Sequence, residues 1–172
     1  MKPIVTLTLN PSIDSACQTE HVRPVHKIRT SDERYDPGGG GINVARVIRE
    51  LGGDCLAVYL AGGLTGQAFN DMIDAIGLER RIIPIADLTR LSHVVYERSS
   101  GQEYRFVPEG PEIHEDEWRT CLAELEQLDV DYFVGSGSLP RGIPEDFYAQ
   151  LARIAKRKGA RFVLDTSGPT LR

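Results

Sequence analysis

The stretch PGGGGINVAR, from Pro37 to Arg46, decides how the rest of this chain is interpreted. Four consecutive glycines lose much backbone entropy on ordering, so a folded protein keeps them where the main chain approaches another group closely or adopts a positive φ. The apolar residues that follow have helical spacing, at Ile42, Ala45, Ile48 and Leu51. The stretch therefore predicts a glycine loop that opens a helix and offers backbone N–H groups to oxygen-rich ligands. A flexible linker is the alternative, but a linker would not be expected to run directly into such a helix.

The composition is that of an ordinary globular domain. Of the 172 residues, 41% are hydrophobic and 26% are charged, which suits one domain with a buried core. A net charge of −5 without a basic stripe disfavours a nucleic-acid partner. Cys17, Cys55 and Cys121 are widely spaced and form no CxxC motif, so neither a disulfide framework nor a zinc site is expected. We also expect no signal peptide and no membrane span, and hence a cytoplasmic protein.

Strand-like and helix-like segments alternate along most of the chain. Apolar, strand-like runs lie at 4–9, 55–61, 81–85, 132–134 and 161–165, with amphipathic helices predicted between most of them. This alternation predicts an α/β domain with a doubly wound, mostly parallel sheet flanked by helices. We expect Thr65 to cap the second helix, Pro144 to lie in a first helical turn, and Gly159 to end a helix. The acidic run from Glu109 to Glu117 is expected to open a further helix.

Two segments break this alternation with short, polar, alternating patterns. Residues 15–36 predict an antiparallel ribbon, and residues 90–107 predict a hairpin around a Ser/Gly turn. Paired with each other, they would form a small antiparallel β lid. Lys27 and Arg29 would share one face of a strand, and Arg90 and Arg105, if brought together, could bind a phosphate. An ordinary solvated sheet edge is the alternative.

Polar and small residues follow the carboxyl ends of several predicted strands. Asp14 lies just beyond the first strand, Gly135–Pro140 follows a later one, and Asp165 ends the last. Open α/β sheets bind ligands along this edge. Asp14 is therefore a candidate ligand for a hydroxyl group, although an Asp in a turn is also a common cap.

Five motifs together resemble those of the ribokinase-like (PfkB) family of carbohydrate kinases, in the family's order and spacing. They are TLNPSID at 8–14, GGGGINVAR at 38–46, AGG at 61–63 with Gly66, GSGSLP at 135–140 and LDTSG at 164–168. By this resemblance, Asp14, Asn43 and the main chain of Gly39 and Gly40 would bind sugar hydroxyls.

The same resemblance assigns the charged residues of the lid. Arg90, Arg105 and Ser138 would bind the phosphate end of the sugar. Lys27 and Arg29 would reach the site of a neighbouring subunit, in a homodimer formed through the β lids.

The activity that the resemblance implies is ATP- and Mg²⁺-dependent phosphorylation of fructose 6-phosphate at its 1-hydroxyl. Relatives acting on fructose 1-phosphate or tagatose 6-phosphate commonly have Lys where this chain has Gly40, and those two activities stay open as alternatives. The family's Gly-Ala-Gly-Asp motif, which supplies the anion hole and the base, does not occur in residues 1–172, nor does its Asn-x-x-Glu segment. We therefore expect no catalytic base and no metal ligand here, but the N-terminal part of a kinase that is inactive alone. The helix-like start at Pro169–Arg172 favours the same interpretation.

Two other classes of protein remain as alternatives. One is a non-catalytic module that binds a sugar phosphate or mediates dimerisation. The other is a dinucleotide-binding domain, but its glycine motif should follow the first strand directly, with an acidic residue about 20 residues later. Here the glycines follow the lid segment instead.

Overall fold

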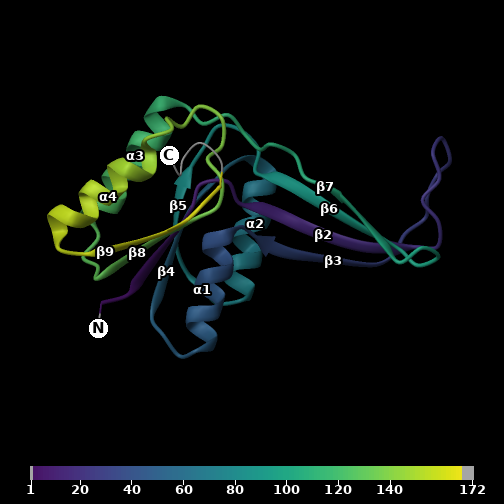
Figure 1. Ribbon diagram of the computed structural model, residues 1–172, viewed down its shortest axis with the longest axis horizontal. Coiled ribbons are helices and arrows are strands. Elements are labelled where there is room, and N and C mark those ends of the chain that lie inside the picture. The colour runs from purple at the N-terminus through teal and green to yellow at the C-terminus, as the bar shows by residue number, and fades with distance from the viewer. Residues whose placement is uncertain (1, 168–172) are drawn as a thin grey trace.

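The computed structural model describes residues 2–167, which form two sheets and four helices (Figure 1). Gly168 of the last motif and the expected helix start at Pro169–Arg172 lie outside the described residues. Among the described residues, no helix has both the length and the apolar character needed to cross a bilayer.

The larger sheet is built around β1 (Ile4–Thr8). Within the described residues its order is β5–β4–β1–β8–β9, and all neighbouring strands are parallel. Its other members are β4 (Cys55–Ala61), β5 (Glu79–Pro84), β8 (Tyr132–Ser136) and β9 (Arg161–Asp165). The chain extends the sheet to one side of β1 and then returns to extend the other. The predicted doubly wound parallel sheet is therefore confirmed.

Helices cover both faces of this sheet (Figure 1). They are α1 (Gly40–Glu50) and α2 (Gly63–Ala75) on one face, and α3 (Glu115–Gln127) and α4 (Phe147–Lys158) on the other. Alternate residues of β4 divide between the two layers, because successive side chains of a strand point to opposite faces. Leu56, Val58 and Leu60 pack with the α3 and α4 side, whereas Ala57 and Tyr59 pack with the α1 and α2 side.

The ends of the helices follow the sequence prediction in part. Gly159 ends α4 with φ 71, as predicted. Thr65 is not a cap, because α2 begins at Gly63 and the N–H of Gly62 donates to Thr89 Oγ1 at 3.1 Å. Pro144 precedes α4, and its carbonyl accepts the N–H of Phe147 at 2.9 Å. The acidic run contributes only its last residues to α3, which begins at Glu115.

The smaller sheet is the predicted lid. Its order is β3–β2–β6–β7, formed by β2 (Ser12–Thr19), β3 (Ser31–Gly38), β6 (Arg90–Glu97) and β7 (Gln102–Phe106). The β2–β3 and β6–β7 pairs are antiparallel as predicted, but β2 and β6 pair in parallel. The lid is thus a mixed sheet, since β2 and β6 both leave the larger sheet from the carboxyl ends of parallel strands. It extends away from the helical layers, with the loop between β2 and β3 at its far end (Figure 1).

Candidate functional site

The candidate site lies where the order of the larger sheet reverses. The chain after β1 builds outward through β4 and β5, and β8 and β9 later form on the opposite side of β1. A crevice forms at the carboxyl ends of two such diverging strands, and ligands of doubly wound sheets bind there. In this chain the end of β1, the end of β8 and the glycine loop meet at that edge.

The glycine loop is held against three different structures at this edge. A Cβ at Gly38 would lie 2.1 Å from Asp14 Oδ2, and a Cβ at Gly40 would lie 2.2 Å from Ser136 Oγ. A Cβ at Gly41 would lie 2.6 Å from the main-chain oxygen of Leu7 in β1. A Cβ at any of the three positions would therefore require the neighbouring group to move. The prediction of an ordered glycine loop that opens a helix is therefore confirmed, and a flexible linker is excluded.

Helix α1 directs its N-terminus at the same edge. Gly39 precedes the helix with φ 124, and the first helical hydrogen bond runs from the Asn43 N–H to the Gly39 oxygen at 3.0 Å. The N–H groups of the first turn have no acceptor inside a helix, and the helix dipole adds partial positive charge. Asn43 itself is exposed. The loop and helix end can therefore donate hydrogen bonds to a polar ligand.

Asp14 adds a half-buried carboxylate to this group of donors. It lies in β2, where the Ser12 hydroxyl donates to its Oδ1 at 2.5 Å. Its other oxygen is the one that faces Gly38. A carboxylate oriented in this way can accept hydrogen bonds from ligand hydroxyl groups.

Ser136 is a site residue that the sequence prediction missed. It is 2% exposed, it ends β8 against the glycine loop, and its hydroxyl donates to Asp165 Oδ2 at 3.0 Å. Ser138, which was predicted, is exposed two residues further on. Both serines belong to the predicted GSGSLP motif, but only the register of β8 distinguishes the one that contacts Gly40.

Arg90 holds main-chain groups in the structure. Its Nη1 donates to the Pro108 oxygen and its Nη2 to the Asn10 oxygen, each at 2.9 Å. Burial lowers the pKa of its guanidinium, and the nearby charge of Asp14 partly opposes that change. Arg90 is therefore close to Asp14, as a site residue should be, but two of its five N–H donors already have protein partners.

Arg105 lies apart from Arg90. It is exposed on β7, where it pairs with Glu103 at 2.9 Å, and its register partner is Val94. Val94 is four residues beyond Arg90, which separates the two positions by about 13 Å along the strands. The structure therefore does not bring the two arginines together, although both lie on the same face of the lid. A phosphate-binding role for Arg105 stays a prediction.

Lys27 and Arg29 are exposed in the loop between β2 and β3. The expectation that they share a strand is wrong, because β3 begins only at Ser31. The base of this loop is held by the Thr19 hydroxyl, which donates to the Arg29 oxygen at 3.1 Å, and by the Val22 N–H, which donates to Glu97 at 2.6 Å. The loop is the part of the lid furthest from the glycine loop of its own chain (Figure 1).

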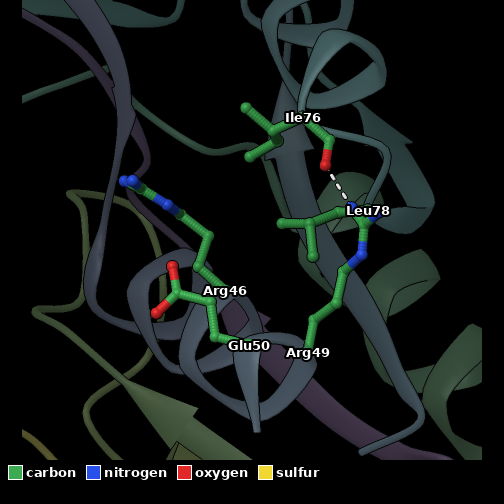
Figure 2. A pocket seen from close by; sticks show the side chains of 5 residues that line it. All are labelled: Arg46, Arg49, Glu50, Ile76 and Leu78. Atoms are coloured by element: carbon green, nitrogen blue, oxygen red, sulfur yellow. Dashed lines mark hydrogen bonds between the residues drawn. The ribbon is translucent and has the colours of Figure 1, made fainter. Parts of the chain in front are cut away.

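A cavity of about 290 Å³ lies away from this edge, beside the C-terminal half of α1 (Figure 2). Its lining residues are Arg46, Arg49, Glu50, Ile76 and Leu78. Arg49 points across it and donates to the main-chain oxygen of Ile76, the residue that ends α2 (Figure 2). A cation at that position satisfies a terminal carbonyl and complements the helix dipole. We therefore attribute this cavity to helix packing and not to ligand binding.

A parallel sheet with its switch point, a glycine loop opening a helix and a β lid define an α/β domain with a candidate site for a small polar ligand. The sequence matches the pfkB family carbohydrate kinases over residues 7–172, and the chain belongs to this family.

The relatives with assigned activities include phosphofructokinases and, at lower identity, kinases of tagatose phosphates. The chain is 44% identical over 167 residues to ATP-dependent 6-phosphofructokinase isozyme 2 of Mycobacterium tuberculosis, covering 96% of this chain and 49% of the relative. It is 38% identical over 172 residues to isozyme 2 of Escherichia coli, covering 99% and 56%. The crystal structure of phosphofructokinase-2 from Escherichia coli in complex with fructose-6-phosphate superposes with a TM-score of 0.92 at 38% identity, over 99% of this chain and 57% of that one. The chain thus spans about half the length of the curated relatives it matches.

Proposed function

We propose that the protein to which this chain belongs is an ATP-dependent kinase that phosphorylates D-fructose 6-phosphate at its 1-hydroxyl, giving fructose 1,6-bisphosphate. The observation that carries the proposal is the meeting of Asp14, the glycine loop and the N-terminus of α1 at one sheet edge beside the lid. The names of the two phosphofructokinase relatives support the same choice.

The residues of this chain would position the acceptor sugar. Asp14 would accept hydrogen bonds from sugar hydroxyls, and the main chain of Gly39 and Gly40 together with Asn43 would donate to them. The 6-phosphate would bind the unused donors of Arg90, with Ser138 and Arg105 completing that end of the site. Phosphoryl transfer depends mainly on positioning and charge neutralisation, and a fixed acceptor geometry removes much of the entropic barrier.

A second subunit would complete the site through its lid. The loop carrying Lys27 and Arg29 lies far from the glycine loop of its own chain, so its cations are placed to meet another molecule (Figure 1). We propose a homodimer formed through the lids, in which these two side chains approach the partner's sugar phosphate. Cations at that position would add to the attraction for a phosphate.

Gly40 supports fructose 6-phosphate over the substrates of the lysine-bearing relatives. A Cβ at this position would lie 2.2 Å from Ser136 Oγ and 3.0 Å from Ser136 Cβ. A lysine at position 40 would therefore displace the end of β8. This geometry favours a 6-phosphofructokinase over a 1-phosphofructokinase or a tagatose-6-phosphate kinase.

ATP and Mg²⁺ are the cosubstrate and the metal that the family implies. Within residues 2–167, no group of three or more His, Cys, Asp or Glu side chains is placed to hold a metal ion. We assign no step to the metal and no catalytic base to this chain. Its contribution is to hold and orient the acceptor.

The test is steady-state kinetics of the full-length protein with ATP and Mg²⁺ on fructose 6-phosphate, fructose 1-phosphate and tagatose 6-phosphate. We expect the highest kcat/KM for fructose 6-phosphate, and a loss of at least about 100-fold in Asp14→Asn, since a positioning carboxylate becomes an amide. The 172-residue chain alone should show no turnover. A preference for either other sugar would overturn the choice of substrate, and binding without turnover by the full-length protein would favour a non-catalytic sugar-phosphate module.

A further inference from the structure

The connections between the larger sheet and the lid converge on one point. Four connections join the two parts within the described residues, at 9–11, 39, 85–89 and 107–114. The position of a Cβ at Gly39 would lie 3.4 Å from the Pro11 Cα, so the first two connections touch. The other two meet the first through the side chains of Asn10 and Arg90. Every path into the lid passes this point, and we call it the hinge.

Asn10 joins the first connection to the last. It is 5% exposed, and its Nδ2 donates to the main-chain oxygen of Glu109 at 2.8 Å. Its own main-chain oxygen accepts the Nη2 of Arg90. A buried amide with these contacts holds the main chain on both sides of the hinge.

Arg90 joins the third connection to the first and the fourth. It is the first residue of β6, and its guanidinium donates to the oxygens of both Asn10 and Pro108. It also lines an open cavity of about 310 Å³ together with Asp87, Leu88, Pro108, Gly110 and Pro111. Nη1 and Nη2 of Arg90 therefore each donate one hydrogen bond within the hinge, while the side chain also borders the cavity.

Gly110 packs directly on the Asn10 amide. It has φ 103, and the three atoms nearest to a Cβ built there all belong to Asn10, with Oδ1 at 2.3 Å. Asn10 Oδ1 has no hydrogen-bond partner among residues 2–167. The amide is thus held in place by its packing on Gly110 and by its hydrogen bond to Glu109, the preceding residue.

We propose that Asn10 is a positioning residue that sets the angle of the lid and, through the shared hinge, the orientation of the Arg90 guanidinium toward the sugar phosphate. Asn10 touches no reacting atom in this arrangement. The link to the sugar phosphate rests on the proposed function, whereas the hinge itself rests only on the contacts of Asn10, Arg90 and Gly110.

The experiment uses the full-length protein with Asn10→Ala. Losing the amide removes the hydrogen bond to the Glu109 main-chain oxygen, which corresponds to up to about tenfold in an equilibrium constant. We expect the KM for fructose 6-phosphate to rise about tenfold, with kcat and the KM for ATP changed by less than about twofold. In the protein without ligand, amide hydrogen exchange should accelerate in β2 and β6 but not in β1 or β4.

Two further variants separate the hinge from a general loss of stability. Asn70→Ala is the matched control, because Asn70 also loses one amide hydrogen bond, with the Tyr59 hydroxyl at 2.9 Å, but lies in α2. It should leave exchange in the lid and the KM for fructose 6-phosphate unchanged. Gly110→Ala should accelerate exchange in the lid as Asn10→Ala does, through both the strain of alanine at φ 103 and the clash with Asn10. Only the clash is relieved in the double variant, which should therefore be less impaired than the sum of the two.

The outcomes are separable. Unchanged exchange in the lid strands of both Asn10→Ala and Gly110→Ala would overturn the hinge, whatever the kinetics. Faster exchange with an unchanged KM for fructose 6-phosphate would overturn the positioning of Arg90. If the unaltered protein does not act on fructose 6-phosphate, the proposed function fails, and the exchange measurement alone then decides on the hinge.

Discussion

The packing of α1 on β1 predicts the effect of one added methyl group. In Gly41→Ala, the new Cβ would lie 2.6 Å from the Leu7 main-chain oxygen, 2.8 Å from the Leu7 carbonyl carbon and 2.5 Å from Thr8 Oγ1. Backbone atoms of a central strand cannot rotate away, so the helix must shift by roughly 0.8 Å to restore ordinary contact. Overpacking of this kind costs about 1–3 kcal/mol, and the better helix propensity of alanine returns up to about 1 kcal/mol. We expect a net loss of about 1–2 kcal/mol.

Urea unfolding measures this loss. With a slope of about 2 kcal/mol/M, the midpoint should fall by about 0.5–1 M with the slope unchanged. Gly38→Ala is the control, because its obstacle is the half-buried Asp14 carboxylate, which can rotate away. That variant should keep its midpoint but lose affinity for fructose 6-phosphate. If Gly41→Ala unfolds at the same urea concentration as the unaltered protein, α1 does not lie directly on the backbone of β1, and the glycine loop is not fixed against that strand.

Three further predictions test the contact of the glycine loop with the end of β8, the hinge at Arg90, and the lid at Glu97. Gly40→Ala should lower kcat/KM for fructose 6-phosphate, and adding Ser136→Ala should restore part of it, since the Cβ would meet Ser136 Oγ at 2.2 Å. Arg90→Lys should raise the KM for fructose 6-phosphate and accelerate exchange in the lid, because an ammonium cannot span both carbonyls as the planar guanidinium does; an unchanged KM would exclude Arg90 from the phosphate site. The hydrogen bond from Ser100, with others, lowers the pKa of Glu97 below its ordinary 4.5. Glu97 therefore stabilises the fold above pH 4.5, and this contribution is lost as the pH falls through the lowered pKa. Urea midpoints measured from pH 7 to pH 3 should fall less steeply below about pH 4.5 in Glu97→Gln, and parallel curves would contradict this role of Glu97.

Local patterns in the sequence determined much of this fold. The glycine run predicted an ordered loop opening a helix, because glycine's entropy cost and the 3.6-residue period act between neighbours in the chain. The apolar run at Cys55–Ala61 has the bounds of β4, since a strand buried on both faces has no polar interruption. The polar alternation of the two lid segments likewise predicted that they would leave the main sheet. Family motifs then placed Asp14 and the glycine loop at one site, and the structure brings them into contact.

Contacts across long separations were decided only by the tertiary structure. The parallel pairing of β2 with β6 depends on where both strands leave the larger sheet, and no local pattern carries that information. The register of β8 decided that Ser136, and not Ser138, contacts Gly40. Arg90 donates a hydrogen bond to the main-chain oxygen of Asn10, 80 positions away. Its role at the hinge could therefore not be predicted from its neighbours in the sequence. A chain specifies its elements through interactions between adjacent residues, but the partners of an exposed donor or acceptor exist only once distant segments have packed together.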